Sequence, residues 1–317
     1  MQVLRARLDG DPAPAALPRG GAVAIGNFDG VHVGHQALLT LARTRAQALG
    51  APTVALTFDP HPATVVATEG PPPLITTFER KLELLEATGV DVCVVVAFTS
   101  ALAATEPDAF ADAALVRVLG AREVVVGAAF RFGQGRRGDV DALRAAGARH
   151  DVTVHAVEPV LVDGELASSS RIRTLIASGD VSAAARVLGR PYDVDGDVVR
   201  GAGRGKTIGI PTANVATPEG TLLPAMGVYA GWAHGLDHKA PRRAAAINLG
   251  NVPTFGGDRL TLEAHVLDFD GDLYGTRVRV AFAERLRGET RFPDVTALVA
   301  QIHRDVDATR ALLETSR

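Results

Sequence analysis

Residues 22–35 read AVAIGNFDGVHVGH and show how the first half of this chain is built. The apolar run Ala22–Gly26 predicts a buried strand, and the apolar spacing of Gln36–Leu49 predicts a helix. Between them lies a glycine-rich loop, where backbone can approach a ligand without a Cβ in the way. Because unpaired N–H groups at a helix N-terminus favour anions, we expect this loop to bind phosphate.

The same alternation of strands and helices continues to about Ala185. The further strands that we predict are Thr53–Phe58, Asp91–Ala97, Glu123–Gly127 and Val152–Val157. The further helices are Phe78–Thr88, Pro107–Leu119 and Val140–Ala146. Because strands this apolar are buried on both faces, the pattern predicts an α/β, doubly wound (Rossmann-like) domain with a parallel sheet.

The pattern changes after Gly189-Arg190-Pro191. Short strand-like runs are now separated by glycine, proline and asparagine, with no helical pattern between them. These runs are Asp193–Gly201, Gly227–Trp232, Arg243–Leu249, Thr261–Leu267 and Arg277–Ala283. We predict an antiparallel β-barrel, with Val295–Glu314 as a terminal helix packed on it. The boundary is expected near residue 188, giving domains 1–188 and 189–317.

Composition narrows the class of protein. A length of 317 residues suits two domains, and 47% apolar residues supply enough material for their cores. A net charge of −3 excludes a broad basic surface, so we expect no nucleic-acid partner. We see no secretory signal and no apolar run of about 20 residues, so we expect a cytoplasmic protein without a membrane partner. Cys93, within a run of valines, is expected to be buried and structural.

Two histidines in the first loop are candidates for chemistry. His32 and His35 are three residues apart and therefore share a face of the first helical turn. Their imidazoles could donate hydrogen bonds to an α-phosphate and to a leaving pyrophosphate as charge builds there. Alternatively, one histidine could cap the helix while the other contacts the core, or the pair could bind a metal ion. The loop carries neither the Walker A pattern nor GxGxxG.

The run from Gly26 to His35 resembles the HxGH signature of nucleotidyltransferases and, over its full length, the prokaryotic FAD synthetases. The resemblance implies transfer of AMP from ATP, with His32 and His35 as catalytic residues. It also implies that ATP is bound by Gly26, Asn27, Phe28, Asp29, His32 and His35.

Three later segments are similar to the same family. Ser168–Arg173 (SSSRIR) resembles its SSTxIR loop, which implies that ATP phosphates are held by Ser169, Ser170 and Arg173. By itself this run would more often be a helix cap. The segments 58–62 and 126–133 resemble loops near the flavin, which implies flavin contacts by Phe58, Pro60 and Phe130. Ala129 departs from the family, which usually has an acid or amide there, and a methyl group forms no hydrogen bond.

A second cluster of motifs lies in the predicted barrel. A glycine-rich basic loop, residues 201–209, leads into Pro211-Thr212-Ala213-Asn214. Such a loop could wrap a polyphosphate, and threonine and asparagine oxygens are ligands that Mg²⁺ accepts. Glu263 could accept a proton, although strand alternation would equally permit a glutamate that faces solvent.

These segments resemble the riboflavin kinase signature, with further matches at 248–255, 263–268, 272–275 and 285–287. The resemblance implies that Mg-ATP is bound by Gly203, Lys206, Thr207, Gly209, Thr212 and Asn214. Thr212 and Asn214 would hold the Mg²⁺, Glu263 would be the catalytic base, and Arg287 and Phe292 would flank the flavin.

The combined resemblance implies a bifunctional enzyme that uses ATP and Mg²⁺ to convert riboflavin to FMN and FMN to FAD. Two alternatives remain at this point. The first, prompted by Ala129, is a paralogue that makes FMN only or acts on a modified flavin. The second, from another functional class, is a non-catalytic sensor of flavin or nucleotide. The sequence carries no signal for an oligomeric state.

Overall fold

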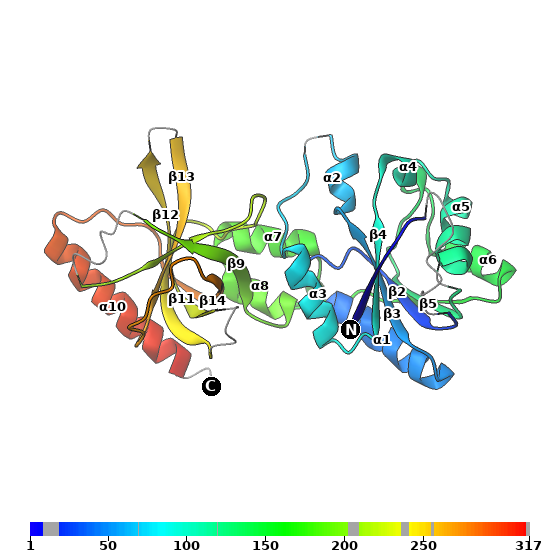
Figure 1. Cartoon of the computed structure of the whole chain (residues 1–317), viewed down its shortest axis with the longest axis horizontal. Coiled ribbons are helices and arrows are strands. Elements are labelled where there is room, and N and C mark those ends of the chain that lie inside the picture. The colour runs from blue at the N-terminus through cyan, green and yellow to red at the C-terminus, as the bar shows by residue number, and fades with distance from the viewer. Residues whose placement is uncertain are drawn as a thin grey trace. The chain divides into compact units, whose positions relative to one another are not determined.

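The computed structural model describes residues 1–8, 19–68, 70–118, 120–201, 209–235, 241–254 and 257–314 (Figure 1). The chain forms two compact units. The first contains Met1–Pro72 and Phe78–Ser168, and the second contains Pro73–Thr77 and Ser169–Arg317.

The first unit is built on a six-stranded sheet in which every neighbouring pair is parallel, in the order β1-β4-β3-β2-β5-β6. Its strands are β1 (Gln2–Ala6), β2 (Ala22–Ile25), β3 (Thr53–Asp59), β4 (Val92–Ala97), β5 (Glu123–Gly127) and β6 (Thr153–Val157). The predicted doubly wound sheet is confirmed. Because β2 lies between β3 and β5, the chain order reverses there, and such switch points are where α/β sheets bind ligands.

Helices cover both faces of this sheet (Figure 1). They are α1 (Val33–Leu49), α2 (Pro62–Val66), α3 (Phe78–Ala87), α4 (Ser100–Ala103), α5 (Pro107–Asp112) and α6 (Val140–Arg149). The helix predicted for Pro107–Leu119 is α-helical only to Asp112 and continues as a π-helix over Ala113–Val118. A short hairpin follows the sheet, formed by β7 (Leu161–Val162) and β8 (Glu165–Leu166).

Alternate residues of one strand pack into different cores. Val94 of β4 belongs to the core beneath α4, α5 and α6, whereas Cys93 and Val95 belong to the core beneath α1 and α3. This is the pattern expected for strands buried on both faces. Burial raises the pKa of the Cys93 thiol to about 11, so this cysteine is an inert core residue.

The second unit is a closed antiparallel barrel in the order β10-β13-β12-β11-β14-β9, as predicted. Its strands are β9 (Tyr192–Val199), β10 (Ala213–Ala216), β11 (Gly227–Gly235), β12 (Arg243–Thr254), β13 (Gly257–Val266) and β14 (Arg277–Arg287). Its helices are α7 (Ser169–Ser178), α8 (Val181–Leu188) and α10 (Val295–Glu314). The terminal helix α10 packs on β11, β12 and β14. In the described part of the chain, every helix is too short or too polar to cross a bilayer.

Candidate active sites

The loop of residues 26–35, which we call the histidine loop, leaves the sheet at the switch point beyond β2. Its first residue, Gly26, donates its N–H to the carbonyl of Leu56 on β3 at 3.1 Å. Phe28 and Val31 adopt left-handed backbone, with φ of 51° and 41°. The Phe28 side chain is fully buried, so packing holds a backbone conformation that most residues avoid.

The two histidines of this loop stack against each other. Their ring centroids are 3.7 Å apart, and His32 Nδ1 caps α1 by accepting the His35 N–H at 3.4 Å. Burial lowers the pKa of His35 well below its ordinary value, and its electrostatic interactions with His32 and Lys81 lower it further. At neutral pH His35 is therefore an uncharged imidazole, able to donate one hydrogen bond and accept another.

A buried lysine lies behind the histidine loop. Lys81 of α3 is 7% exposed, and its Nζ lies 3.3 Å from both Thr57 Oγ1 and the Phe58 carbonyl. The Thr57 hydroxyl in turn donates to the Asn27 carbonyl at 3.1 Å. The loop is thus connected to β3 and α3 through one hydroxyl group.

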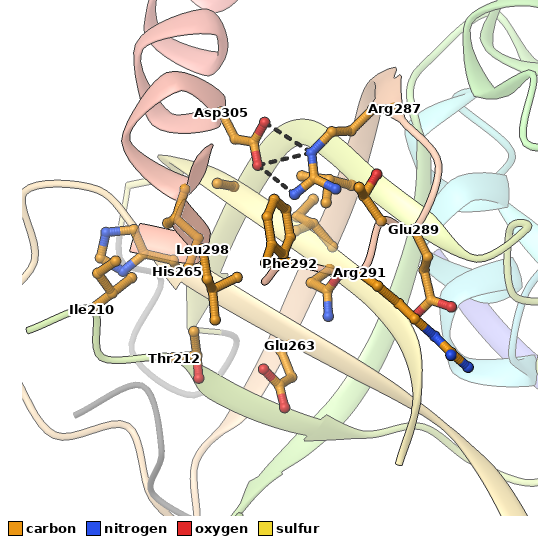
Figure 2. Close-up of a pocket in the computed structure, with 16 residues that line it drawn as sticks. Ile210, Thr212, Glu263, His265, Arg287, Glu289, Arg291, Phe292, Leu298 and Asp305 are labelled. Atoms are coloured by element: carbon orange, nitrogen blue, oxygen red, sulfur yellow. Dashed lines mark hydrogen bonds and ion pairs between the residues drawn. The ribbon is translucent and has the colours of Figure 1, made fainter. Parts of the chain in front are cut away.

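The cavity of the second unit lies between the barrel wall and α10 and has a volume of about 580 Å³ (Figure 2). Thr212 and Glu263 lie at one end of it in this view, and Arg287 and Asp305 lie at the other, with Phe292 between them. Such a volume is typical of pockets for molecules of drug size.

Glu263 is placed by the pairing of three strands. It lies opposite Asn214 of β10 and opposite Asn248 of β12. Its neighbours on β13, Leu262 and Ala264, are buried on the other face. Glu263 therefore does face outward from the barrel, as alternation permits, but that outer surface is the wall of the cavity rather than open solvent.

The PTAN segment is held beside this carboxylate. The Pro211 carbonyl accepts a hydrogen bond from His265 Nδ1 at 2.7 Å, which requires the proton to be on Nδ1. A Cβ at Gly201 would collide with the Asn214 side chain, so glycine permits this close approach. These contacts keep Thr212 and Asn214 on the same side of the barrel as Glu263.

An ion pair closes the far end of the cavity. The Arg287 guanidinium donates to both Asp305 oxygens from Nε at 3.1 Å, and from Nη2 to Oδ2 at 2.8 Å. Asp305 comes from α10 and Arg287 from the end of β14, so the pair joins the helix to the barrel. The guanidinium carbon also lies 5.7 Å from the centre of the Phe292 ring, in the range of a cation–π contact.

Comparisons with known proteins match two families in succession along the chain. A family model described as FAD synthetase matches residues 15–171, and one described as riboflavin kinase matches residues 188–313. A bifunctional riboflavin kinase/FMN adenylyltransferase of Pseudomonas fluorescens is 39% identical over 299 residues, covering 94% of each chain. Proteins of the same description from Escherichia coli K12 and Bacillus subtilis are 38% and 33% identical, over 92% and 89% of each chain.

This chain belongs to the bifunctional riboflavin kinase/FMN adenylyltransferase family. A solved structure has a similar fold. A crystal structure described as a macrolide-efflux protein from Streptococcus pneumoniae has a TM-score of 0.88 and 30% identity, covering 98% of this chain and 99% of that one.

The residues that the FAD synthetase resemblance singles out lie in both units. The carboxyl ends of β2, β3 and β5 bring together the histidine loop, Phe58 with Pro60, and the turn that contains Phe130. Phe58 is buried against Phe98, with ring centroids 5.6 Å apart. Ser169, Ser170 and Arg173 begin helix α7 of the second unit, where Arg173 Nε donates to the Pro73 carbonyl at 2.8 Å.

The residues expected to bind ATP in the riboflavin kinase part are described only partly. Gly209, Thr212 and Asn214 lie where β10 begins, with Gly209 in left-handed backbone at φ 78°. Gly203, Lys206 and Thr207 fall outside the described residues.

Sequence reasoning missed two buried charged residues that contact predicted site residues. Lys81 reaches the histidine loop through Thr57, and Asp305 pairs with Arg287. Their only signal in the sequence is spacing: Lys81 precedes buried Leu85 by four residues, and Asp305 follows Ile302 of the cavity by three.

Proposed function

We propose that this chain performs both reactions named for its relatives, making FMN in its barrel and FAD in its first domain. The observation that carries the proposal is the placement of Glu263 opposite Asn214, in the wall of a cavity that also contains Thr212 and Arg287. A proton acceptor, oxygen ligands and an aromatic wall are together the parts that phosphorylation of a flavin alcohol needs.

In the proposed kinase reaction, the Glu263 carboxylate accepts the proton of the ribityl 5′-hydroxyl of riboflavin. The oxygen forms a bond to the γ-phosphorus of ATP, and the bond from that phosphorus to the β,γ-bridging oxygen breaks. ADP leaves, and FMN remains. Arg287 and Phe292 would flank the flavin ring, because an aromatic face and a planar cation are both groups on which an aromatic ligand can stack.

Magnesium fits the residues beside Glu263. The Thr212 hydroxyl and the Asn214 amide oxygen are hard neutral donors, and we propose that they hold the ion together with ATP. When bound, Mg²⁺ neutralises charge on the phosphate oxygens.

In the proposed adenylyl transfer, a phosphate oxygen of FMN attacks the α-phosphorus of ATP. The bond to the α,β-bridging oxygen breaks, and pyrophosphate leaves. His32 and His35 would stabilise the charge that builds on the phosphates, since both lie at the N-terminus of α1. ATP would also contact Gly26, Asn27, Phe28, Asp29, Ser169, Ser170 and Arg173, and the flavin would contact Phe58, Pro60 and Phe130.

We also propose that the functional boundary lies near residue 188. The two family models leave residues 172–187 between them, and α7 and α8 group with the barrel by contacts. The start of α7 carries the SSSRIR motif that resembles the adenylyltransferase family, which supports assigning these helices to the first function.

One observation favours a second candidate, a chain that makes only FMN. Ala129 lies exposed in the turn after β5, where its methyl group offers a flavin no hydrogen bond. Incubation with riboflavin, ATP and Mg²⁺, followed by chromatography, separates the candidates. FMN and FAD together support the proposal, FMN alone supports the second candidate, and neither product indicates a binding protein.

A further inference from the structure

Lys81 lies in a position where charge is unfavourable. It occupies the buried face of α3 together with Leu84 and Leu85, and a methionine would fill the same space without the loss of hydration that a charged ammonium suffers. Its Nζ has two oxygen partners, Thr57 Oγ1 and the Phe58 carbonyl, and the Phe78 ring lies 5.3 Å away. A buried cation of this kind calls for an explanation beyond packing.

The surroundings of Lys81 lead to the histidine loop. Thr57 is fully buried and directs its hydroxyl to the Asn27 carbonyl, immediately before the left-handed residue Phe28. Because the Lys81 ammonium can only donate, it occupies the acceptor side of the Thr57 oxygen and directs the hydroxyl proton toward Asn27. The backbone that precedes both histidines is therefore fixed by a two-step relay from α3.

The charges around Lys81 also belong to the loop and its neighbours. Burial lowers the pKa of Lys81, while Asp29 of the loop, Cys93 of β4 and Asp59 of β3 favour its charged form. Its positive charge in turn opposes protonation of His35, as does His32. Lys81 thus acts on the loop through a hydrogen bond and through its charge.

We propose that Lys81 is a positioning residue for adenylyl transfer, which holds the Thr57 hydroxyl against the Asn27 carbonyl and thereby fixes the loop that presents His32 and His35. The inference rests on the proposed function of the first domain. Lys81 contacts neither ATP nor FMN in this account, and its effect passes through Thr57.

The test compares Lys81→Met, Thr57→Val and the double variant, with FMN and ATP as substrates. Each single variant should lower kcat for FAD formation roughly 10- to 100-fold, because small displacements of reacting groups have effects of that size. KM for ATP should change less than about threefold. The double variant should lose no more than Lys81→Met alone, because both substitutions break the same relay.

The same polypeptide supplies the control. Phosphorylation of riboflavin should stay unchanged in all three variants, and Arg144→Met, which removes an exposed cation paired with Asp141 at 2.9 Å, should alter neither reaction. If Lys81→Met fails to fold, Thr57→Val decides alone. A wild-type kcat in a folded single variant, or losses that multiply in the double variant, would overturn the proposal.

A readout independent of activity separates this inference from the proposed function. NMR titration of the His35 ring should show a higher midpoint in Lys81→Met than in the wild type, since a repelling charge is removed. If the wild-type chain makes no FAD from FMN, adenylyl transfer is refuted. The titration then tests separately whether the charge of Lys81 acts on His35. An unchanged His35 midpoint would then overturn the role of Lys81.

Discussion

Asn214 and Glu263 lie directly opposite each other on the antiparallel strands β10 and β13, with both side chains on the cavity side of the barrel. Residues paired in this way have neighbouring side chains, so a candidate metal ligand and a candidate base are fixed by strand register rather than by a loop. A register shift of one residue in β10 would turn Asn214 away from the cavity and leave Glu263 without its partner.

Replacing the carboxylate tests its role as the base. Glu263→Gln should lower the rate of FMN formation by about 10²- to 10⁴-fold, the usual contribution of proton transfer, and leave conversion of FMN to FAD unchanged. Chromatography of products from riboflavin and from FMN measures the two rates. Glu284→Gln, an exposed glutamate on β14, is the control. Loss of both reactions in Glu263→Gln would refute independent sites.

The Arg287–Asp305 pair should stabilise the barrel as well as the flavin pocket. Asp305→Asn leaves a partly buried guanidinium without its counter-charge, so we expect a loss of about 2–4 kcal/mol in unfolding free energy and a raised KM for riboflavin. Trp232, the only tryptophan, lies on β11 and reports barrel unfolding by fluorescence.

Asp268→Asn is the matched comparison, because Asp268 pairs at an exposed site with Arg310, which lies on α10 as Asp305 does. Solvent screens an exposed pair, so this variant should be nearly as stable as the wild type. Equal effects of the two substitutions would contradict the role given to Asp305.

The first unit should lose stability in acid through Glu123. Hydrogen bonds from Arg45, at 2.5 and 2.8 Å, are the main cause that lowers the pKa of this buried carboxyl, and His155 contributes at 2.8 Å. Its stabilisation is therefore present above the unfolded pKa of about 4.3 and is lost as pH falls through the lower folded value. Unfolding of the wild type and Glu123→Gln, followed from pH 7 to 3, should show converging stabilities; a constant difference would argue against this origin.

His35 should titrate below its ordinary value of about 6.5, because burial and the neighbouring charges of His32 and Lys81 disfavour the proton. The unfolded chain then binds a proton that the folded loop does not, so the first unit loses stability as pH falls below about 6.5. NMR of the ring resonances gives the midpoint. A midpoint at or above 6.5 would contradict the buried, neutral imidazole.

Periodicity predicted most of the elements, and the exceptions have physical causes. β1 (Gln2–Ala6) is an edge strand with exposed and charged positions, so it lacks the apolar run that marks its buried neighbours. β10 (Ala213–Ala216) has only four residues and follows Pro211, so it is too short to stand out among the strands that the sequence predicts. A strand this short is formed because it pairs with its neighbours, here β9 and β13.

The candidate site residues were predicted from motifs, whereas their supporting residues were not. Lys81 lies in the charged run Glu79-Arg80-Lys81, which is typical of a solvated helix face, and only packing of α3 on the sheet shows that it is buried. Asp305 likewise lies among polar residues of α10. Its partner Arg287 is 18 residues earlier in the sequence, and pairing across that separation has no local signal.

Mixing two variants tests whether one chain holds two complete and separate sites. Glu263→Gln should make FMN only about 10²- to 10⁴-fold more slowly than the wild type, and His35→Asn should make FMN normally but form FAD about 10²- to 10³-fold more slowly. Supplied with riboflavin, ATP and Mg²⁺, an equimolar mixture should form FAD, because FMN released by one variant is adenylylated by the other. A mixture that forms no FAD would contradict the account.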